Sequence, residues 1–318
     1  GGRRVLIALL SEDGSPALRE NARLRHKALI PACRVTMHIP ASIGDYTDFF
    51  TSRDHAYNCG CMFRDPSKAL QDNFLHLPVG YHGRASSVYV SGTGVPRPSG
   101  QVISVRGDPS QGSKHAPTSA LDFEMELGYF VGGPPTDPGH VMTLSEAEDR
   151  IFGVVLLNDW SARDIQAWEY VPLGPFTAKN FATSISPWVV TMDALQPFRC
   201  GSVSSQPSDP EPLSYLRDPR PSHYDINLTV EIQGAGMAGY HKVTDTNAKH
   251  IFWTFKQQLA HHTVSGCRMR PGDLCGTGTI SGGGASSMGC LLEQSWNSTR
   301  DVMLGDSGER RRFLLVSE

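Results

Sequence analysis

The chain has 318 residues, which is enough for one large domain or two ordinary ones. Its 29 Lys and Arg residues against 32 Asp and Glu residues give a formal net charge of −3, which argues against a nucleic-acid partner, because such proteins need surplus cations. Hydrophobic residues at 39% suffice for a core, and 32 glycines with 22 prolines favour many short strands joined by turns.

The cysteines and the apolar runs indicate where in the cell the protein is expected to be. None of the seven cysteines has C-x-x-C spacing, so we expect reduced thiols in a cytoplasmic protein. The longest apolar run, 151–157, is far shorter than the roughly 18 residues of a membrane span. The six apolar residues 5–10 are too few for a secretory signal. No membrane partner is expected.

Periodicity predicts a helix over 16–30 and then mainly strands. Residues 119–131 alternate, with apolar residues on one side and Asp122, Glu124 and Glu126 on the other, which predicts a half-buried strand. The run 151–157 predicts a strand covered on both faces. A helix is expected from an N-cap at Ser161 to about Tyr170.

The second half of the chain has fewer clear elements. We predict a strand over 225–232, a helix from about 247 to 262, and a hairpin in which 302–304 and 313–316 flank the turn 305–308. The segments 105–118 and 200–222 are rich in Pro, Ser, Asp and Gly and are expected to be loops. The fold class expected is α+β, mainly β with a few helices.

Acidic residues near the predicted strands suggest a site. Glu124 and Glu126 on one strand face are typical either of a solvated face or of a cation site. Asp159 favours the second, because an ionised group at the end of a buried strand is costly unless it is paired or metal-bound. In the next helix, Arg163, Gln166 and Tyr170 share one polar face.

A further segment, 44–56, contains Asp48 and His55, which share a face if it is helical. Four carboxylates, Asp48, Glu124, Glu126 and Asp159, would suit Mg²⁺, Ca²⁺ or Mn²⁺. They carry two charges more than such an ion neutralises, so a cation such as Lys179 would be favourable nearby. A single histidine is more often structural than catalytic.

The same segments resemble the fumarylacetoacetate hydrolase family. The matching stretches are PASIGDYTDFF (40–50), LHLPVGYHGRASS (75–87), LDFEMELGYFVG (121–132), LNDWSARDIQAWEYVPLGPFTAKNFATSISPWV (157–189), RPGDLCGTGTISG (270–282) and LLEQSW (291–296). The resemblance implies a mixed β-sandwich roll, a homodimer, and metal-dependent hydrolysis of a small molecule, 4-fumarylacetoacetate, to fumarate and acetoacetate in tyrosine and phenylalanine breakdown. The alternatives are an acylpyruvate hydrolase or decarboxylase and an inactive oligomerising fragment.

The resemblance also assigns roles to residues. It implies Ca²⁺ or Mg²⁺ held by Asp48, Glu124, Glu126 and Asp159, with Lys179 and Thr183 at a neighbouring Mg²⁺ site. It makes His55 the general base, oriented by Glu293, and it gives the developing oxyanion to Arg163, Gln166 and Lys179. Implied substrate contacts are Phe50 (a Tyr in mammalian members), Arg64, Tyr81, Gln166, Tyr170 and Thr279.

The resemblance also suggests how the chain divides. We expect residues 1–35 to be an N-terminal helical segment and 36–318 to be the catalytic domain. Family members carry an SH3-like domain before this region and more strands after Leu315, so we expect both to be missing here.

Overall fold

The computed structural model describes residues 2–105, 107–201, 210–220 and 222–316, in two compact units, Gly1–His38 and Ile39–Glu318. The first unit contains three α-helices, α1 (Gly2–Leu10), α2 (Pro16–Arg19) and α3 (Ala22–Ala28), and the 3₁₀ turn η1 (Ala32–Arg34). The single helix predicted over 16–30 is therefore wrong. It is two helices because the side chain of Asn21 accepts a hydrogen bond from the amide of Leu24 and starts a second one.

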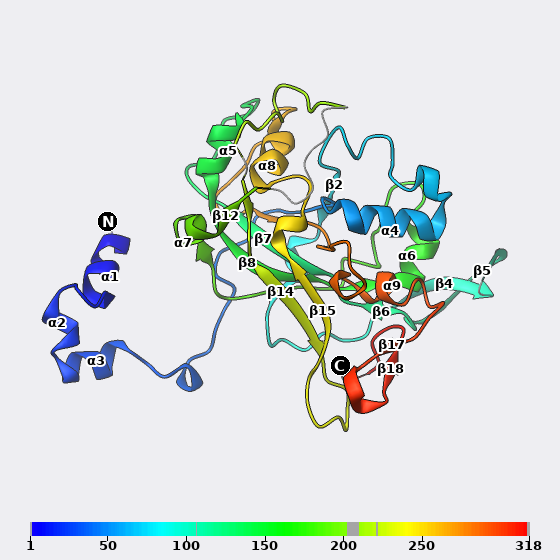
Figure 1. Cartoon of the computed structure of the whole chain (residues 1–318), viewed down its shortest axis with the longest axis horizontal. Helices are drawn as coiled ribbons and strands as arrows, with labels where there is room; N and C mark the ends of the chain where they lie inside the picture. The colour runs from blue at the N-terminus through cyan, green and yellow to red at the C-terminus, as the bar shows by residue number, and fades with distance from the viewer. Residues whose placement is uncertain (1, 106, 202–209, 221, 317–318) are drawn as a thin grey trace. The chain divides into compact units, whose positions relative to one another are not determined.

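The second unit is built on a mixed sheet of eight strands (Figure 1), which confirms the α+β class. Its order is β2-β1-β16-β7-β8-β10-β3, and β11 also pairs with β8. The β1–β16 and β10–β3 pairs are parallel and the others antiparallel. The strands are β1 (Tyr46–Phe49), β2 (Gly80–Gly83), β3 (Val88–Val90), β7 (Met125–Val131), β8 (Ile151–Asp159), β10 (Thr183–Ile185), β11 (Val190–Thr191) and β16 (Leu274–Gly276).

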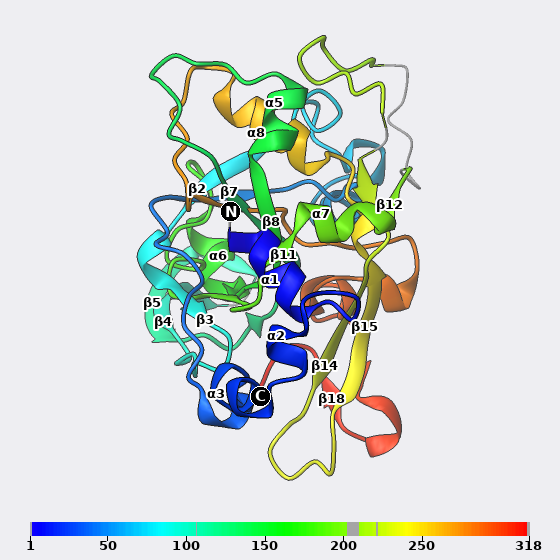
Figure 2. The ribbon, with the colours of Figure 1, turned by 90° about the vertical axis from the view of Figure 1, so that its left-hand side faces the viewer.

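Helices cover this sheet and fill the core. Tyr129 of β7 packs against Phe255 of α8, in a cluster that also contains Leu259 and Val154. Figures 1 and 2 show α5 and α8 packed together, with the β14–β15 ribbon extending away from them. The α-helices of this unit are α4 (Arg53–Phe63), α5 (Leu144–Arg150), α6 (Arg163–Glu169), α7 (Met192–Leu195), α8 (Phe255–Thr263) and α9 (Leu291–Gln294). Six 3₁₀ turns complete the described elements of the unit: η2 (Pro66–Lys68), η3 (Ala85–Ser87), η4 (Gln196–Phe198), η5 (Ala248–His250), η6 (Ala285–Ser287) and η7 (Gly305–Ser307).

Five two-stranded antiparallel pairs surround the sheet. The predicted loop over 105–118 is wrong, because most of it is one arm of a hairpin whose largely exposed strand needs no apolar alternation. In the predicted loop over 200–222, Cys200 ends a strand, whereas residues 201, 210–220 and 222 have neither helix nor strand. Residues 202–209 and 221 lie outside the described residues. The pairs are β4 (Ser99–Val105) with β5 (Asp108–Pro117), β6 (Leu121–Asp122) with β9 (Ser161–Ala162), β12 (Arg199–Cys200) with β13 (His223–Tyr224), β14 (Asn227–Ile232) with β15 (His241–Asn247), and β17 (Val302–Met303) with β18 (Arg310–Arg311).

Several predicted boundaries shift. The strand over 225–232 is confirmed as β14, but α8 starts at Phe255 and not near 247, because Thr254 and Gln257 form a capping box there. The second arm of the last hairpin is 310–311 and not 313–316 as predicted, and Leu314 pairs instead with Leu121. Helix α6 starts at Arg163 and not after Ser161, whose hydroxyl donates to the carbonyl of Asp159.

Strand β8 is not covered on both faces as predicted. Phe152 and Leu156 are 57% and 54% exposed, while Val154 and Val155 are buried in the core. The exposed side chains of Phe152 and Leu156 therefore do not contribute to the core of this chain. Exposed apolar surface of this kind can mark a contact with another molecule.

Two features of the structure bear on the expected cellular location. All seven cysteines are free thiols, as expected. Within the described ranges, no helix combines the length and the apolar character needed to cross a membrane.

Candidate active site

Three buried carboxylates meet where neighbouring strands of the sheet lie side by side. Asp48 is on β1, Glu126 on β7, and Asp159 ends β8; β16 lies between β1 and β7 and presents Gly276 there. One oxygen from each carboxylate lies within 4.8 Å of the other two. A Cβ atom on Gly276 would lie 3.0 Å from Glu126 and 3.2 Å from Asp48, so the glycine leaves room for these oxygens.

The electrostatics of this carboxylate triad (Asp48, Glu126 and Asp159) call for a cation. Burial raises the pKa of Asp48, and Asp159 raises it further; burial, then Asp48 and Asp159, raise the pKa of Glu126. Among the described residues, Oδ1 of Asp48 and Oε1 of Glu126 have no hydrogen-bond partner. Orphaned, crowded carboxylate oxygens are suited to a hard divalent cation, so the donor set fits a metal.

Glu124 differs from the other predicted ligands. Its Oε1 is 2.8 Å from Nη1 of Arg163, and its Oε2 accepts a 2.6 Å hydrogen bond from Lys179. Burial acts to raise the pKa of Glu124, but Lys179 and Arg163 outweigh it and hold the pKa well below its usual range. Glu124 is therefore an ionised partner of two cations beside the triad.

The 119–131 segment, which carries two of these acids, is not one half-solvated strand. It is interrupted between β6 and β7, and residues 120–131 are all buried. The predicted polar face lies against the site and not against water, which rules out the solvated alternative for Glu124 and Glu126.

Asp159 is held by three donors from different segments. Lys179 donates to its Oδ2 at 2.7 Å, Tyr81 of β2 at 3.4 Å, and Thr183 of β10 donates to its Oδ1 at 3.2 Å. Burial acts to lower the pKa of Lys179, but Asp159 and Glu124 raise it above its usual range, so Lys179 stays a cation.

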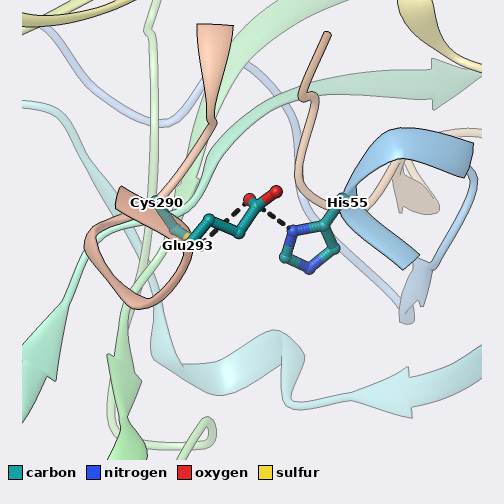
Figure 3. Close-up of side chains that lie close together, drawn as sticks. All are labelled: His55, Cys290 and Glu293. Carbon is teal, nitrogen blue, oxygen red and sulfur yellow. Dashed lines mark hydrogen bonds and ion pairs between the residues drawn. The ribbon is translucent and has the colours of Figure 1, made fainter. Parts of the chain in front are cut away.

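A second buried group consists of His55 and Glu293 (Figure 3). Nδ1 of His55, in the first turn of α4, lies 2.6 Å from Oε2 of Glu293 on α9. Glu293 also accepts hydrogen bonds from Asn58 at 2.8 Å and from Ser281 at 2.7 Å. Because Asp48 is on β1 and His55 is on α4, the two do not share a helical face as predicted.

Both groups of this pair have shifted pKa values. Burial acts to raise the pKa of Glu293, but the nearby His55 and the hydrogen bonds to Glu293 outweigh it and lower the pKa. Burial acts to lower the pKa of His55, but Cys59 and Glu293 outweigh it and hold the pKa well above its usual range. The pair therefore favours an imidazolium beside a carboxylate in the resting site.

Arg163 connects the triad region to α9. Its Nε donates to Asp122 at 2.9 Å and its Nη1 to Gln166 at 3.2 Å, whereas Nη2, although buried, has no partner among the described residues. Asp122 also accepts hydrogen bonds from the amides of Leu291 and Leu292 at the start of α9. The alternation of residues 119–131 places Asp122 on the polar side of a half-buried strand, but its side chain is completely buried.

The predicted substrate contacts have varied positions. The ring of Phe50 packs edge-on against His55 with centroids 5.2 Å apart, and Thr279 is buried with a hydroxyl that lacks a partner in the described part of the chain. Tyr170 caps the end of α6 and is 51% exposed. The structure does not join Arg64 to the site, since its guanidinium donates to the carbonyls of Lys68 and Ala69.

A cavity of about 190 Å³ reaches Asp159 of the triad, whereas Asp48, Glu126 and His55 are not part of its lining. Tyr46, Tyr81, Asp159, Phe176 and Lys179 are among its lining residues. Sequence reasoning missed Tyr46 and Asp122, and also Asn58 and Ser281, which hold Glu293. Asp122 had a signal, as a third acid in the alternating segment, but the others lie in no pattern that marks a site.

Comparisons with known proteins are consistent with this geometry. A family profile described as "Fumarylacetoacetate (FAA) hydrolase C-terminal" matches residues 46–307. Fumarylacetoacetase from Caenorhabditis elegans is 53% identical over 98% of this chain and 72% of that protein. Fumarylacetoacetase from Homo sapiens is 50% identical over 98% of this chain and 73% of that protein. Among solved structures, a putative HpcE protein from Mycobacterium smegmatis is similar, with a TM-score of 0.52 and 21% sequence identity. The match covers 89% of this chain and 78% of that chain, and it supports the fold alone.

Proposed function

Because the chain belongs to the fumarylacetoacetate hydrolase family, we propose that it is a hydrolase that cleaves a carbon–carbon bond of 4-fumarylacetoacetate to give fumarate and acetoacetate. This would be the last step of tyrosine and phenylalanine breakdown. The observation that carries the proposal is the buried His55–Glu293 pair beside a cation-seeking carboxylate triad, since hydrolysis of a diketone needs a base and charge stabilisation.

The triad of Asp48, Glu126 and Asp159 would hold a divalent cation, for which we propose Mg²⁺ or Ca²⁺ because all the donors are carboxylate oxygens. When bound, that ion would polarise a substrate carbonyl and help to neutralise the negative charge that develops on the departing acetoacetate group. Glu124 would act differently from the sequence-based assignment, by fixing Lys179 and Arg163 through its two ion pairs.

The residues of the chain would carry the proton and stabilise charge. His55, oriented by Glu293 and in its neutral form, would take a proton from water while the water oxygen attacks the carbonyl carbon. The partnerless Nη2 of Arg163, the Gln166 amide and the Lys179 ammonium would stabilise the oxyanion. When the carbon–carbon bond breaks, the electron pair stays on the acetoacetate carbon, which would take its proton from the His55 imidazolium, because Lys179 is held as a cation.

Tyr81, Thr279 and Gln166 would contact the substrate from within the site, and Phe50 would offer an apolar ring where the mammalian relatives offer a hydroxyl. Arg64 and Tyr170 would contribute only after leaving their present positions, since Arg64 is bonded to carbonyls and Tyr170 is half exposed.

Turnover assays test the reaction against its rivals. We expect purified chain with Mg²⁺ or Ca²⁺ to release fumarate and acetoacetate from 4-fumarylacetoacetate, and to act far more slowly on acylpyruvates or oxaloacetate. A preference for acylpyruvates, or decarboxylation without hydrolysis, would replace the proposed substrate. Metal binding without turnover of any of these compounds would favour the non-enzymatic alternative.

Lys179 should be sensitive to shape as well as to charge. Its ammonium lies between Glu124 and Asp159, so Lys179→Met is expected to weaken both metal affinity and the rate by removing the cation that offsets these carboxylates. Lys179→Arg keeps the charge, but a planar guanidinium does not fit the position of a compact ammonium, so we expect impairment as well. Steady-state kinetics decides: an arginine variant as active as wild type would show that charge alone is sufficient.

We propose a homodimer that covers the exposed face of β8. Phe152, Leu156 and Trp188 expose much of their apolar surface on or beside this strand, and a second copy would remove that surface from water. Phe152→Glu is expected to shift the chain to monomer in analytical ultracentrifugation, because a carboxylate would be buried in the contact. Leu213→Glu, at an exposed position away from β8, is the control. A wild-type monomer, or a dimer in both variants, would contradict this surface.

A cytoplasmic location is also part of the proposal. It is supported by the seven free thiols, since free cysteines persist in reducing compartments.

A further inference from the structure

We propose that His55, Glu293, Cys290 and Cys59 form a second metal site, which binds thiophilic ions such as Zn²⁺ or Cd²⁺. It is distinct from the carboxylate triad, which offers only hard oxygen donors. One donor atom from each of His55, Cys290 and Glu293 lies within 4.8 Å of the other two (Figure 3). Imidazole with two thiols and a carboxylate is a donor set typical of zinc.

The spacing of three of the donors, His55, Cys290 and Glu293, is compatible with a tetrahedral ion that Cys59 completes. Zinc bonds of ordinary length give donor–donor separations of about 3.3–3.8 Å at the edges of a tetrahedron. Sγ of Cys290 lies 3.3 Å from Oε2 of Glu293, and Sγ of Cys59 lies 3.7 Å from Nε2 and 3.9 Å from Nδ1 of His55. The His55–Glu293 contact of 2.6 Å must widen, since the ion would replace the proton between these two atoms. The Cys59 side chain must also turn toward the ion, because its sulfur is not among the three donors that already lie within 4.8 Å of one another.

The protons and charges of this site can be accounted for. Binding breaks two S–H bonds and removes the proton between Nδ1 of His55 and Oε2 of Glu293, and all three protons go to the solvent. Two thiolates and one carboxylate exceed the charge of a divalent ion by one. Arg163 lies close enough to interact electrostatically with both cysteines and would offset that remaining charge.

The site has an approach from solvent and a consequence for activity. Cys290 and Glu293 are completely buried, but Cys59 is only partly buried and lies one helical turn after His55 on α4. An ion bound here would occupy the imidazole lone pair and displace the proton that His55 shares with Glu293. Zn²⁺ should therefore inhibit; only this consequence rests on the proposed role of His55 as base.

Cobalt spectroscopy tests the site without reference to turnover. The full chain is first saturated with Mg²⁺ to fill the triad and is then titrated with Co²⁺. We expect one equivalent to give a thiolate-to-cobalt charge-transfer band with the intense visible bands of tetrahedral cobalt, and Zn²⁺ to abolish both. Weak octahedral bands alone, or no thiolate band, would overturn the proposal.

Variants locate the ion. Cys290→Ser is expected to lose most of the thiolate band, and Cys59→Ser to weaken Co²⁺ binding by more than about tenfold. Cys61→Ser, two residues further along the same helix, is the matched control and should keep the wild-type titration. Cys59 is partly exposed, so its variant decides the question if Cys290→Ser does not fold. A band that persists unchanged in Cys59→Ser and in a folded Cys290→Ser would place the ion elsewhere.

Discussion

Asp159→Asn should reduce hydrolysis to near background and weaken divalent metal binding by at least about 100-fold, a loss at the upper end of that seen for outer-shell partners of metal ligands. Asp159 is the carboxylate that ties the triad to Lys179, Thr183 and Tyr81, and the amide keeps its shape without its charge. Burial raises the pKa of Asp159, which means that its charge is a cost to the folded chain. We therefore expect the melting temperature in metal-free buffer to be unchanged or higher.

Calorimetric titration with Mg²⁺ and with Ca²⁺ measures the binding, and circular dichroism follows the melting. Asp164→Asn is the control, because this carboxylate accepts hydrogen bonds from Thr118 and Ser119 and lies outside the triad. Unchanged metal affinity in the Asp159 variant would remove this residue from the set of ligands.

The raised pKa values of Asp48 and Glu126 have a related consequence for metal binding. Both groups must be ionised to bind a cation, and their protonated fraction increases as the pH falls through the raised pKa values. Divalent metal affinity should therefore weaken on acidification, beginning above the ordinary carboxyl range near pH 4. The same titrations at several pH values check this.

His55→Ala should slow hydrolysis by about 10²–10⁴-fold, the usual contribution of a positioned general base, while divalent metal still binds at the triad. The pH profile gives a sharper test, because Cys59 and Glu293 hold the pKa of His55 well above its usual range against the effect of burial. The free base increases as the pH rises through that pKa, so kcat/KM should rise with pH along a limb centred above about 6.5.

Glu293→Gln separates catalysis from structure. It removes the negative charge that stabilises the imidazolium, so the pKa of His55 should fall and the acid limb should move to lower pH. His140→Ala, at an exposed position, should leave both rate and profile unchanged. A loss of less than about tenfold in His55→Ala, with the acid limb still in place, would return His55 to a structural role.

The sequence predicted the triad better than its surroundings. Asp159 follows the apolar run of β8 by two residues, and an acid at the end of a buried strand is a local signal that pointed to the place where the three carboxylates meet. The alternating segment 119–131 supplied Glu126 and the segment 44–56 supplied Asp48, and the family resemblance implied that all three bind a metal. By contrast, His55 and Glu293 are separated by 238 positions, so only the fold brings them together and no local pattern pairs them.

The errors have identifiable physical causes. The alternation in 119–131 predicted a solvent-exposed polar face. Polar side chains that line a buried site recur at every second residue, just as polar side chains that face water do, so the pattern alone does not separate the two. Strand β5 was missed because a largely exposed hairpin arm needs no apolar pattern. The ion pairs of Glu124 depend on Lys179, which approaches from an irregular segment after α6 whose course no periodicity predicts.

Asp122 links three segments that are distant in the sequence. Its carboxylate holds the guanidinium of Arg163 and the first two amides of α9, the short helix that carries Glu293. Arg163, which we propose stabilises charge, and Glu293, which orients the base, are thus both positioned by the Asp122 carboxylate. Energetic effects of substitutions at Arg163 and Glu293 are consequently not independent, and a double-mutant cycle between them measures the strength of that mechanical coupling.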